Sequence, residues 1–376
     1  MSPVRFGILG CGQAASFHLS ASRNNPDVQF VSVCAPDEAA LLRLAKRNKL
    51  RPCSDLQEFL QTGIDAVLIT TPHHLHPSLT QAAAEAGKHV LCEKPMANSL
   101  EECDQMIAGA RKAGVKLMIA ENHRFLPAHQ FIRDAVASGA IGDVFLVRSY
   151  EGAYDNPKKI LDPDAWMFSY DRGGGGALHD QGAHKFAVLN WLLGTVDSAL
   201  CWCAKVLNSP PSKGEDTAMV LLRYKNGAMA EVTVSTATVH VPTNRLEVHG
   251  TKGTILEDHD WERPVKVYPC FRTSGFSQPF QSPELEHGPF PQYYTISFRN
   301  EVAHFAECIL NDTPPAFTPE EAREAIAVTH LAYLAAKKRS VATLEELKEL
   351  VRTKGTRSLF EGLDEATWKN YENLRW

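Results

Sequence analysis

The sequence has no apolar run close to the ~20 residues that a membrane-spanning helix requires. Neither charge dominates: 39 Lys and Arg stand against 44 Asp and Glu, for a net charge of -5. The basic surface of a nucleic-acid-binding protein is therefore not expected. The nine cysteines include no C-x-x-C pair, which disfavours a zinc ribbon and indicates reduced thiols. An apolar signal segment after Met1 is lacking as well. These absences predict a cytoplasmic protein with neither membrane nor nucleic-acid partners.

Length and composition indicate a folded chain with more than one domain. At 376 residues the sequence exceeds the usual size of a single domain. Its content of 44% hydrophobic and 22% charged residues is ordinary for a globular protein. Two domains are therefore expected, each with its own core.

A glycine-rich turn follows the first strand-like segment, Val4–Leu9. It reads Gly10-x-Gly12-x-x-Ala15 and opens a predicted helix that reaches about Asn24. Gly10 permits a tight turn, Gly12 lets the backbone approach a pyrophosphate, and Ala15 lets the helix pack closely on the strand. The helix N-terminus then presents unpaired N–H groups to the phosphates. This order of strand, glycine turn and helix predicts a dinucleotide site.

The end of the second predicted strand, Phe30–Cys34, bears on which nicotinamide cofactor is bound. An acid that holds the ribose hydroxyls is expected directly after this strand, but Ala35 stands there. Asp37 fits an N-cap of the following helix better than a ribose ligand. No Arg or Ser cluster follows to hold a 2′-phosphate. The sequence therefore predicts NAD, with NADP as the alternative.

Three further strand-like runs, 66–70, 89–92 and 116–120, alternate with helices and predict a doubly wound parallel sheet. The carboxyl ends of such strands line the ligand crevice, and Lys94 follows the middle run. Its ammonium group can donate to a hydroxyl or carbonyl oxygen. His73, His74 and His76 follow the first run. Their spacing also suits a metal ion, but no Cys or carboxylate accompanies them, and no metal is predicted.

An acid and an imidazole, Asp180 and His184, follow the glycine run 173–176. On a helix, residues at i and i+4 share one face, so the carboxylate can orient the imidazole as a general base. The glycines can let the backbone pass close to a ligand. A flexible helix entry with a solvated His is the alternative interpretation of this common pattern.

These motifs occur in the order found in the Gfo/Idh/MocA oxidoreductases, which include glucose–fructose oxidoreductase and inositol 2-dehydrogenase. The chain resembles this family from about residue 4 to 345. The motifs that carry the resemblance are Gly10-x-Gly12-x-x-Ala15, Thr71-Pro72-x-x-x-His76, Cys92-Glu93-Lys94-Pro95, Asn122-x-Arg124-Phe125 and Gly175-Gly176-x-x-x-Asp180-x-Gly182-x-His184. Two departures are the missing ribose acid at Ala35 and His123, which stands where an aromatic residue is common.

The resemblance implies that Lys94 polarises the reacting oxygen, His184 takes the hydroxyl proton, and Asp180 orients His184 or holds a neighbouring hydroxyl. The nicotinamide supplies the redox chemistry. The implied cofactor contacts are Gly10, Gly12, Gln13, Ala14, Ala35, Asp37, Thr71, Pro72, His73, His76, Glu93, Lys94 and Asn122. The implied substrate contacts are Lys94, Arg124, Trp166, Asp180, His184 and Lys185. Lys158 and Lys159 are further cations that a sugar acid would suit.

After residue 124 the pattern changes to one of mixed helices and strands. The predicted strands are 144–151, 198–207, 217–224, 228–236 and 245–250, with a turn at Lys225-Asn226-Gly227. We therefore predict an α/β Rossmann domain (1–123), an α+β domain (124–345) and a C-terminal extension (346–376). The resemblance implies a large open, mostly antiparallel sheet that forms a homodimer or homotetramer. The segment 264–291 is expected to be a long excursion, and the tail is expected to dock on its own domain or on a neighbour.

Three functions fit these residues. The first is an NAD(P)-dependent dehydrogenase of a sugar, polyol or sugar acid. The second recycles tightly bound NAD in a redox-neutral isomerisation, elimination or glycoside cleavage. The third is a sugar-sensing regulator, which the presence of Lys94, Asp180 and His184 disfavours because such relatives typically lose the catalytic lysine or histidine.

Overall fold

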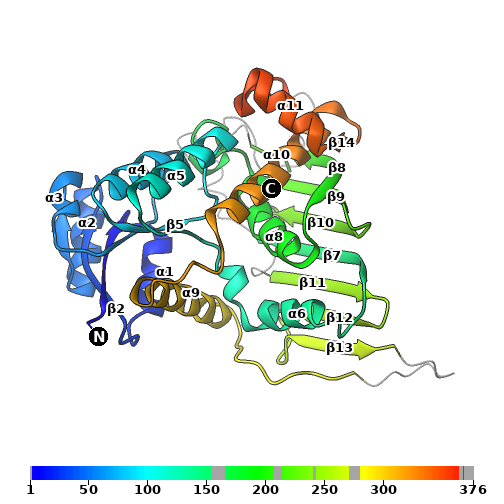
Figure 1. The fold of residues 1–376 in the computed structure, drawn as a ribbon, viewed down its shortest axis with the longest axis horizontal. Coiled ribbons are helices and arrows are strands. Elements are labelled where there is room, and N and C mark those ends of the chain that lie inside the picture. Colours follow the sequence, from blue (N-terminus) through cyan, green and yellow to red (C-terminus); the bar gives the residue numbers. More distant parts are fainter. Residues whose placement is uncertain are drawn as a thin grey trace. The chain divides into compact units, whose positions relative to one another are not determined.

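The computed structural model describes residues 2–153, 166–206, 214–239, 243–270, 280–363 and 367. The chain forms two compact units (Figure 1). The first contains Met1–Phe125 and Tyr294–Arg323, and the second contains Leu126–Tyr293 and Glu324–Trp376. Within the described part of the chain, no helix has both the length and the apolar character needed to cross a membrane.

The first unit contains a six-stranded parallel sheet in the order β3-β2-β1-β4-β5-β6. Its strands are β1 (Val4–Leu9), β2 (Val28–Cys34), β3 (Arg51–Cys53), β4 (Ala66–Ile69), β5 (His89–Glu93) and β6 (Leu117–Ala120). Helices α1 (Gln13–Ala21), α2 (Glu38–Asn48), α3 (Leu56–Leu60), α4 (His76–Glu85) and α5 (Leu100–Ala113) connect them. The strand order reverses between β1 and β4, as in a doubly wound dinucleotide-binding sheet. The predicted Rossmann fold is confirmed.

Local signals set the ends of these helices. The Asp37 side chain accepts a hydrogen bond from Ala40 N–H at 2.9 Å and caps α2, so the predicted capping role is confirmed. The end of α4 is set by Gly87, which has φ +69. Its N–H donates to Ala84, and Lys88 N–H donates to Ala83. This pair of hydrogen bonds is a Schellman motif, which satisfies carbonyls that the helix leaves open.

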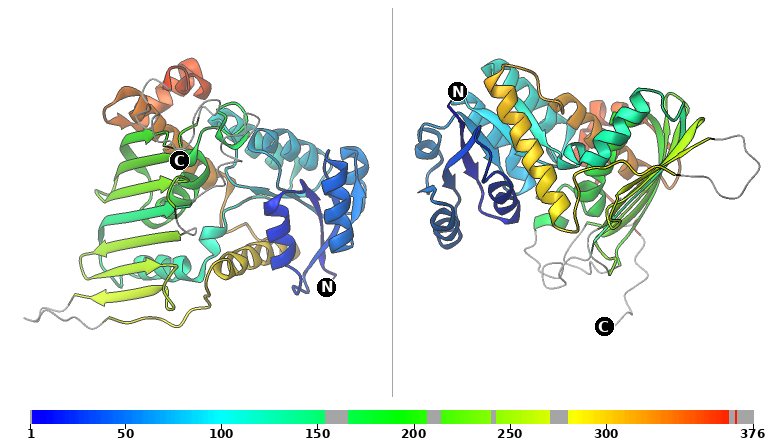
Figure 2. Two further views of the ribbon diagram at one scale, coloured as in Figure 1. Left: turned by 180° about the vertical axis from the view of Figure 1, so that it is seen from behind. Right: turned by 90° about the horizontal axis from the view of Figure 1, so that it is seen from below.

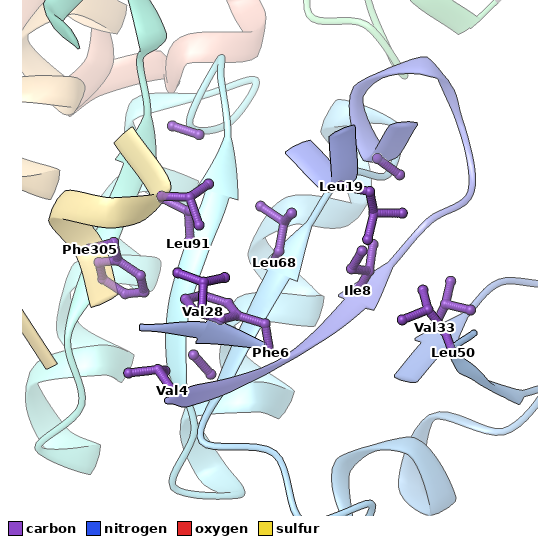
Figure 3. Packing of buried hydrophobic residues seen from close by; sticks show 14 of the residues in the cluster. Val4, Phe6, Ile8, Leu19, Val28, Val33, Leu50, Leu68, Leu91 and Phe305 are labelled. Atoms are coloured by element: carbon purple, nitrogen blue, oxygen red, sulfur yellow. The ribbon is translucent and has the colours of Figure 1, made fainter. Parts of the chain in front are cut away.

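A helix from late in the chain completes the core of the first unit. Helix α9 (Gln292–Leu310) contributes Val302, Phe305 and Ala306 to the apolar cluster around Phe6 (Figure 3). The rings of Phe6 and Phe305 lie 6.3 Å apart, and both side chains are fully buried. Burying a phenylalanine stabilises the folded state by about 1.5–3 kcal/mol. The sequence-based division of the chain does not anticipate this return to the first unit.

The second unit contains an eight-stranded sheet in the order β13-β12-β11-β7-β10-β9-β8-β14. Its strands are β7 (Val144–Gly152), β8 (Val196–Ala204), β9 (Thr217–Tyr224), β10 (Met229–Ser235), β11 (Thr243–Gly250), β12 (Gly253–Asp258), β13 (Val265–Pro269) and β14 (Ala342–Thr343). Only the pairing of β7 with β10 is parallel among the strand pairs of the described residues. The predicted mostly antiparallel sheet is confirmed.

The two faces of this sheet differ. Helices α6 (Pro127–Ala137) and α8 (Ala177–Leu193) lie on one face, and among the described residues no helix covers the opposite face in the view from behind (Figure 2). Strand alternation buries Ala218, Val220 and Leu222 of β9 on the helix side. The other side exposes four large apolar side chains, which are Trp202, Met219, Leu221 and Met229. We call these four residues the open-face cluster.

Two expectations about the second half have mixed outcomes. The segment 264–291, expected to be a long excursion, begins with the edge strand β13, and Val267 forms a bridge with Gln281. The sequence did not predict this strand pairing. In the tail, α11 (Leu344–Lys354) is followed by Leu359, which is fully buried, and by Phe360, which stacks on Tyr170 at 4.9 Å. These residues dock on their own unit as predicted. The tail aromatics Trp368, Tyr371 and Trp376 lie outside the described residues.

Candidate active site

The glycine turn after β1 has the backbone that a dinucleotide-binding turn requires. Gly10 has φ +104, and a Cβ there would meet the Thr70 carbonyl oxygen at 2.7 Å. At Gly12 an added Cβ would meet nothing of the chain within 4 Å. Gly12 is therefore not needed for packing, and the space beside it suits a pyrophosphate in front of α1. Ala15 is fully buried against the sheet. Gln13 is exposed and Ala14 half-buried in the first turn of α1.

At the end of β2, Ala35 is buried and Asp37 is exposed. The Oδ1 atom of Asp37 is used in the α2 cap. A cap of this kind leaves the second carboxylate oxygen accessible, so capping and ribose binding are compatible. The contact of either residue with a cofactor stays a prediction.

The loop after β4 is tied to the loop after β5 by a histidine. His76 is fully buried, with Nε2 3.0 Å from the Thr71 carbonyl oxygen and Nδ1 3.0 Å from that of Pro95. Burial lowers the pKa of His76, and a neutral imidazole can donate from only one nitrogen. His76 therefore donates to one of these two carbonyls at a time. Pro72 and His73 lie four and three residues before His76 in the same loop, and His73 is also buried.

Lys94 directly follows β5 and stands next to Glu93, whose carboxylate contacts a buried histidine of α1. The Oε1 atom of Glu93 is 2.7 Å from Nε2 of His18, and Glu93 Oε2 accepts the Lys94 N–H at 3.2 Å. His18 is fully buried, and Glu93 is nearly so. Glu93 thus fixes the backbone from which the Lys94 side chain departs. His18 has no motif signal, because its partner is 75 residues away in sequence.

Two polar residues after β6 are engaged inside the first unit. Asn122 donates from Nδ2 to Ser297 Oγ at 2.8 Å. Arg124 is buried, donates from Nη2 to Glu321 at 2.9 Å and stacks its guanidinium 4.4 Å from the centre of the Phe317 ring. These contacts give Arg124 a structural role that its sequence context does not reveal. Its expected contact with substrate stays a prediction.

A buried acid that the sequence does not single out lies near Glu93. Glu301 of α9 is fully buried, and neither of its oxygens has a hydrogen-bond partner. Burial raises the pKa of Glu301 well above its usual range, and the charges of Glu93 and Glu121 add to the effect. Burial therefore favours the protonated form of Glu301.

In the second unit, α8 carries Asp180 and His184 one helical turn apart on one face. His184 is buried, and Asp180 is half-buried in the first turn of the helix. Helical spacing for this pair is confirmed. Convergence of this pair with Lys94, which belongs to the first unit, stays a prediction.

The N-terminus of α8 is held by Glu215 and Tyr333. Glu215 Oε1 accepts the Leu178 N–H at 2.7 Å and the Tyr333 hydroxyl at 3.0 Å. The Tyr333 oxygen in turn accepts the Gly176 N–H at 3.2 Å. Two of the open N–H groups of the helix are satisfied in this way. Burial raises the pKa of Glu215 to about 7.

The glycines before α8 serve this junction. A Cβ on Gly176 would overlap the carbonyl oxygen of Glu215, and a Cβ on Gly175 would overlap the hydroxyl of Tyr333. A Cβ on Gly173 would overlap the Met167 carbonyl oxygen. The glycines thus let the backbone approach other parts of the protein's own chain closely. The expectation of a ligand at this place has no support from these contacts.

The other residues expected to contact the substrate differ in their surroundings. Lys185 is buried, contacts Asn244 Oδ1 and lies 3.4 Å from Glu151 Oε2. Trp166 is half-buried in the short helix Trp166–Phe168. Lys158 and Lys159 lie outside the described residues. Asn244 and Glu151 were missed, because their partner lies on another element.

Two protein-family models match this chain. Residues 4–121 match the model described as "Oxidoreductase family, NAD-binding Rossmann fold", and residues 129–256 match "GFO/IDH/MocA C-terminal domain". The fold and the glycine turn define an NAD-binding oxidoreductase. The chain belongs to the Gfo/Idh/MocA oxidoreductase family, as its motifs predicted.

Three similar proteins illustrate the match. The chain is 30% identical over 310 residues to the uncharacterized oxidoreductase YrbE of Bacillus subtilis (strain 168), covering 81% of this chain and 85% of the relative. It is 29% identical over 311 residues to an inositol 2-dehydrogenase of Rhizobium meliloti (strain 1021), covering 81% and 88%. Levoglucosan dehydrogenase in complex with NADH and L-sorbose has a TM-score of 0.83 over 92% of this chain and 99% of that one. At 22% identity that likeness shows the fold alone.

Proposed function

We propose that the protein is an NAD-dependent dehydrogenase that acts on a secondary alcohol of a sugar, polyol or sugar acid. The observation that carries the proposal is the buried His184 one turn from Asp180 on α8, a helix whose N-terminus Glu215 holds. The relative named inositol 2-dehydrogenase acts, by its name, on a polyol of this class.

The residues divide the chemistry between them. Lys94 donates a hydrogen bond to the reacting oxygen and stabilises the charge that develops on it. His184 accepts the hydroxyl proton as general base, and Asp180 orients the imidazole. Bound NAD supplies the hydride chemistry. The turn at Gly10 and Gly12 and the open N-terminus of α1 fit the pyrophosphate of that cofactor.

The preference for NAD over NADP rests on the end of β2. Ala35 and Asp37 offer no cation for a 2′-phosphate, and the Asp37 carboxylate would repel one. A free oxygen of the same carboxylate can accept from a ribose hydroxyl.

Assembly through the open-face cluster is part of the proposal. Trp202 is 59% exposed and Met229 54% exposed on the sheet face opposite α6 and α8. Contiguous apolar side chains of this size typically mark an interface between proteins. A homodimer or homotetramer formed by this face would bury them, and light scattering of the wild type and of Trp202→Glu would detect it.

A redox-neutral reaction with tightly held NAD is the second candidate, because its catalytic residues would be the same. One experiment separates the two. The purified protein is denatured and any released nucleotide is identified by mass, while a second portion is incubated with sugars, polyols, sugar acids and glycosides. Turnover that requires added NAD supports the dehydrogenase. Released NAD together with transformed substrate and no net reduction supports recycling, and no turnover with or without NAD contradicts both.

A further inference from the structure

A buried carboxylate lies between two imidazoles in the second unit, away from α8. Glu257 stands near the end of β12, His259 follows that strand, and His129 lies in the first turn of α6. Figure 1 shows α6 beside β11 and β12, the strands at this side of the sheet. All three side chains are about 2% exposed, so solvent does not compensate their charges.

The donor atoms of the three residues point to a common centre. One donor atom of each residue, an imidazole nitrogen or a carboxylate oxygen, lies within 4.8 Å of the donor atoms of the other two. His129 Nε2 is 3.8 Å from Glu257 Oε2, and His259 Nε2 contacts Glu257 Oε1 more closely. Ligands held 2.0–2.1 Å from a tetrahedral zinc ion are separated by about 3.3 Å. The two contacts of Glu257, one longer and one shorter, lie on either side of that value.

The hydrogen bonding of these atoms is incomplete. Both oxygens of Glu257 and Nε2 of His259 have no partner of hydrogen-bond geometry, although the residues are in contact. Buried polar atoms rarely stay in this condition, and a bound ion is one way in which such atoms are satisfied. The lone pairs on these atoms can therefore bind one shared cation.

The charge balance favours a cation. A carboxylate buried between two neutral imidazoles carries a negative charge that solvent does not compensate, which is costly to bury. A divalent cation held by the three residues would offset that charge.

We propose that His129, Glu257 and His259 bind a zinc ion. Two imidazole nitrogens and one carboxylate oxygen form a donor set that zinc uses. The imidazole ligands favour zinc over Mg²⁺ and Ca²⁺, which prefer oxygen ligands. Three protein ligands leave the fourth tetrahedral position to a water molecule.

The ligands come from two elements, so zinc would fasten the start of α6 to the end of β12. This junction also continues toward Lys185, because the His259 N–H donates to the Asn244 carbonyl at 3.2 Å and the Asn244 side chain contacts Lys185. His287 adds support from the other side, with Nε2 3.0 Å from the His259 carbonyl oxygen. Zinc would therefore stabilise the part of the second unit that contacts Lys185 of α8.

The alternative is a proton-bridged triad, in which one imidazolium pairs with Glu257 and no metal binds. Metal content of the untagged full-length protein separates the two. We expect roughly one zinc per chain in the wild type. After removal of metal by a chelator, added Zn²⁺ should raise the thermal midpoint.

Glu257→Gln keeps the shape of the side chain and removes the charge. We expect it to lower the zinc content at least about tenfold, whereas the matched control Glu247→Gln, on the partner strand β11, should retain zinc. Co²⁺ added to the chelated wild type should give the absorption of tetrahedral N/O ligation, which tests the site even where Glu257→Gln fails to fold. A wild type that contains no zinc and neither binds added Zn²⁺ nor gives the Co²⁺ spectrum would overturn the proposal. Equal zinc content in Glu257→Gln and in the wild type would overturn it too.

Discussion

Glu215 accepts a hydrogen bond from the Leu178 N–H at 2.7 Å, and through it a loop 37 residues away holds the first turn of α8. Asp180 and His184 follow on the same helix, so any shift of its N-terminus moves them. Glu215 and Tyr333 are therefore positioning residues in the proposed reaction.

Glu215→Ala should lower kcat by roughly 10- to 100-fold, because a displacement of about 1 Å at the reacting groups has effects of that size. Glu215→Gln should recover most of the loss, since its amide oxygen can still accept the Leu178 N–H. The Kd for NAD should not change in either variant. An Ala variant with wild-type kcat would contradict the positioning role.

The same carboxyl group makes stability depend on pH. Burial raises the pKa of Glu215 from 4.5 to about 7, so its contribution to folding is fully present below pH 4.5 and is lost as the pH rises through about 7. The shift corresponds to about 3 kcal/mol at most. Glu215→Gln removes this dependence. Denaturant unfolding at pH 5 and pH 8 should therefore show the variant gaining stability relative to the wild type at the higher pH.

A pair of glycine substitutions separates packing from ligand binding. Gly176→Ala should destabilise the protein strongly, because the new methyl group overlaps the Glu215 carbonyl. Gly12→Ala meets no atom of the chain and should leave the thermal midpoint unchanged. It should instead weaken NAD binding, since the methyl group projects where the pyrophosphate approaches. Unaltered NAD affinity in Gly12→Ala would place the cofactor elsewhere.

Lys94→Ala tests the proposed chemistry directly. Turnover should fall by about 100-fold or more, as expected when a donor to the developing charge is removed. NAD affinity should stay within roughly twofold, because the glycine turn binds the pyrophosphate. Lys112→Ala, on the exposed side of α5, is the matched control. Equal turnover of the Lys94 variant and the control would exclude the assigned role.

Arg124→Met distinguishes a structural arginine from a substrate ligand. The guanidinium is buried against Glu321 and Phe317, and its loss leaves the carboxylate without that partner. We expect a loss of about 2–4 kcal/mol in the free energy of unfolding, moderated because the Glu321 side chain is 38% exposed. A variant of normal stability with a raised KM for the sugar would assign Arg124 to substrate binding instead.

The sequence predicts those parts of this protein whose cause is local. Asp37 caps α2 through a hydrogen bond from Ala40 N–H, three residues away, as predicted, and Gly87 ends α4 through a hydrogen bond to Ala84, three residues away. The glycine turn and the alternation of strands and helices identify the parallel sheet for the same reason.

Features that depend on distant partners escaped prediction. Arg124 meets Glu321 across 197 residues, and Lys185 meets Asn244 across 59, so neither pairing leaves a local pattern. The glycine run before α8 was expected to approach a ligand, whereas its nearest neighbours are Glu215 and Tyr333. Strand β13 was missed because prolines and serines surround a run of only five residues.

The return of α9 to the first unit has a consequence for how the protein is made. A ribosome completes all strands of the parallel sheet well before it reaches Phe305, and until then the part of the apolar cluster that α9 covers stays open. The nucleotide-binding unit therefore finishes folding only after most of the second unit has left the exit tunnel. A gene fragment that stops after Phe125 would encode an unfinished, aggregation-prone half and not an independent NAD-binding module.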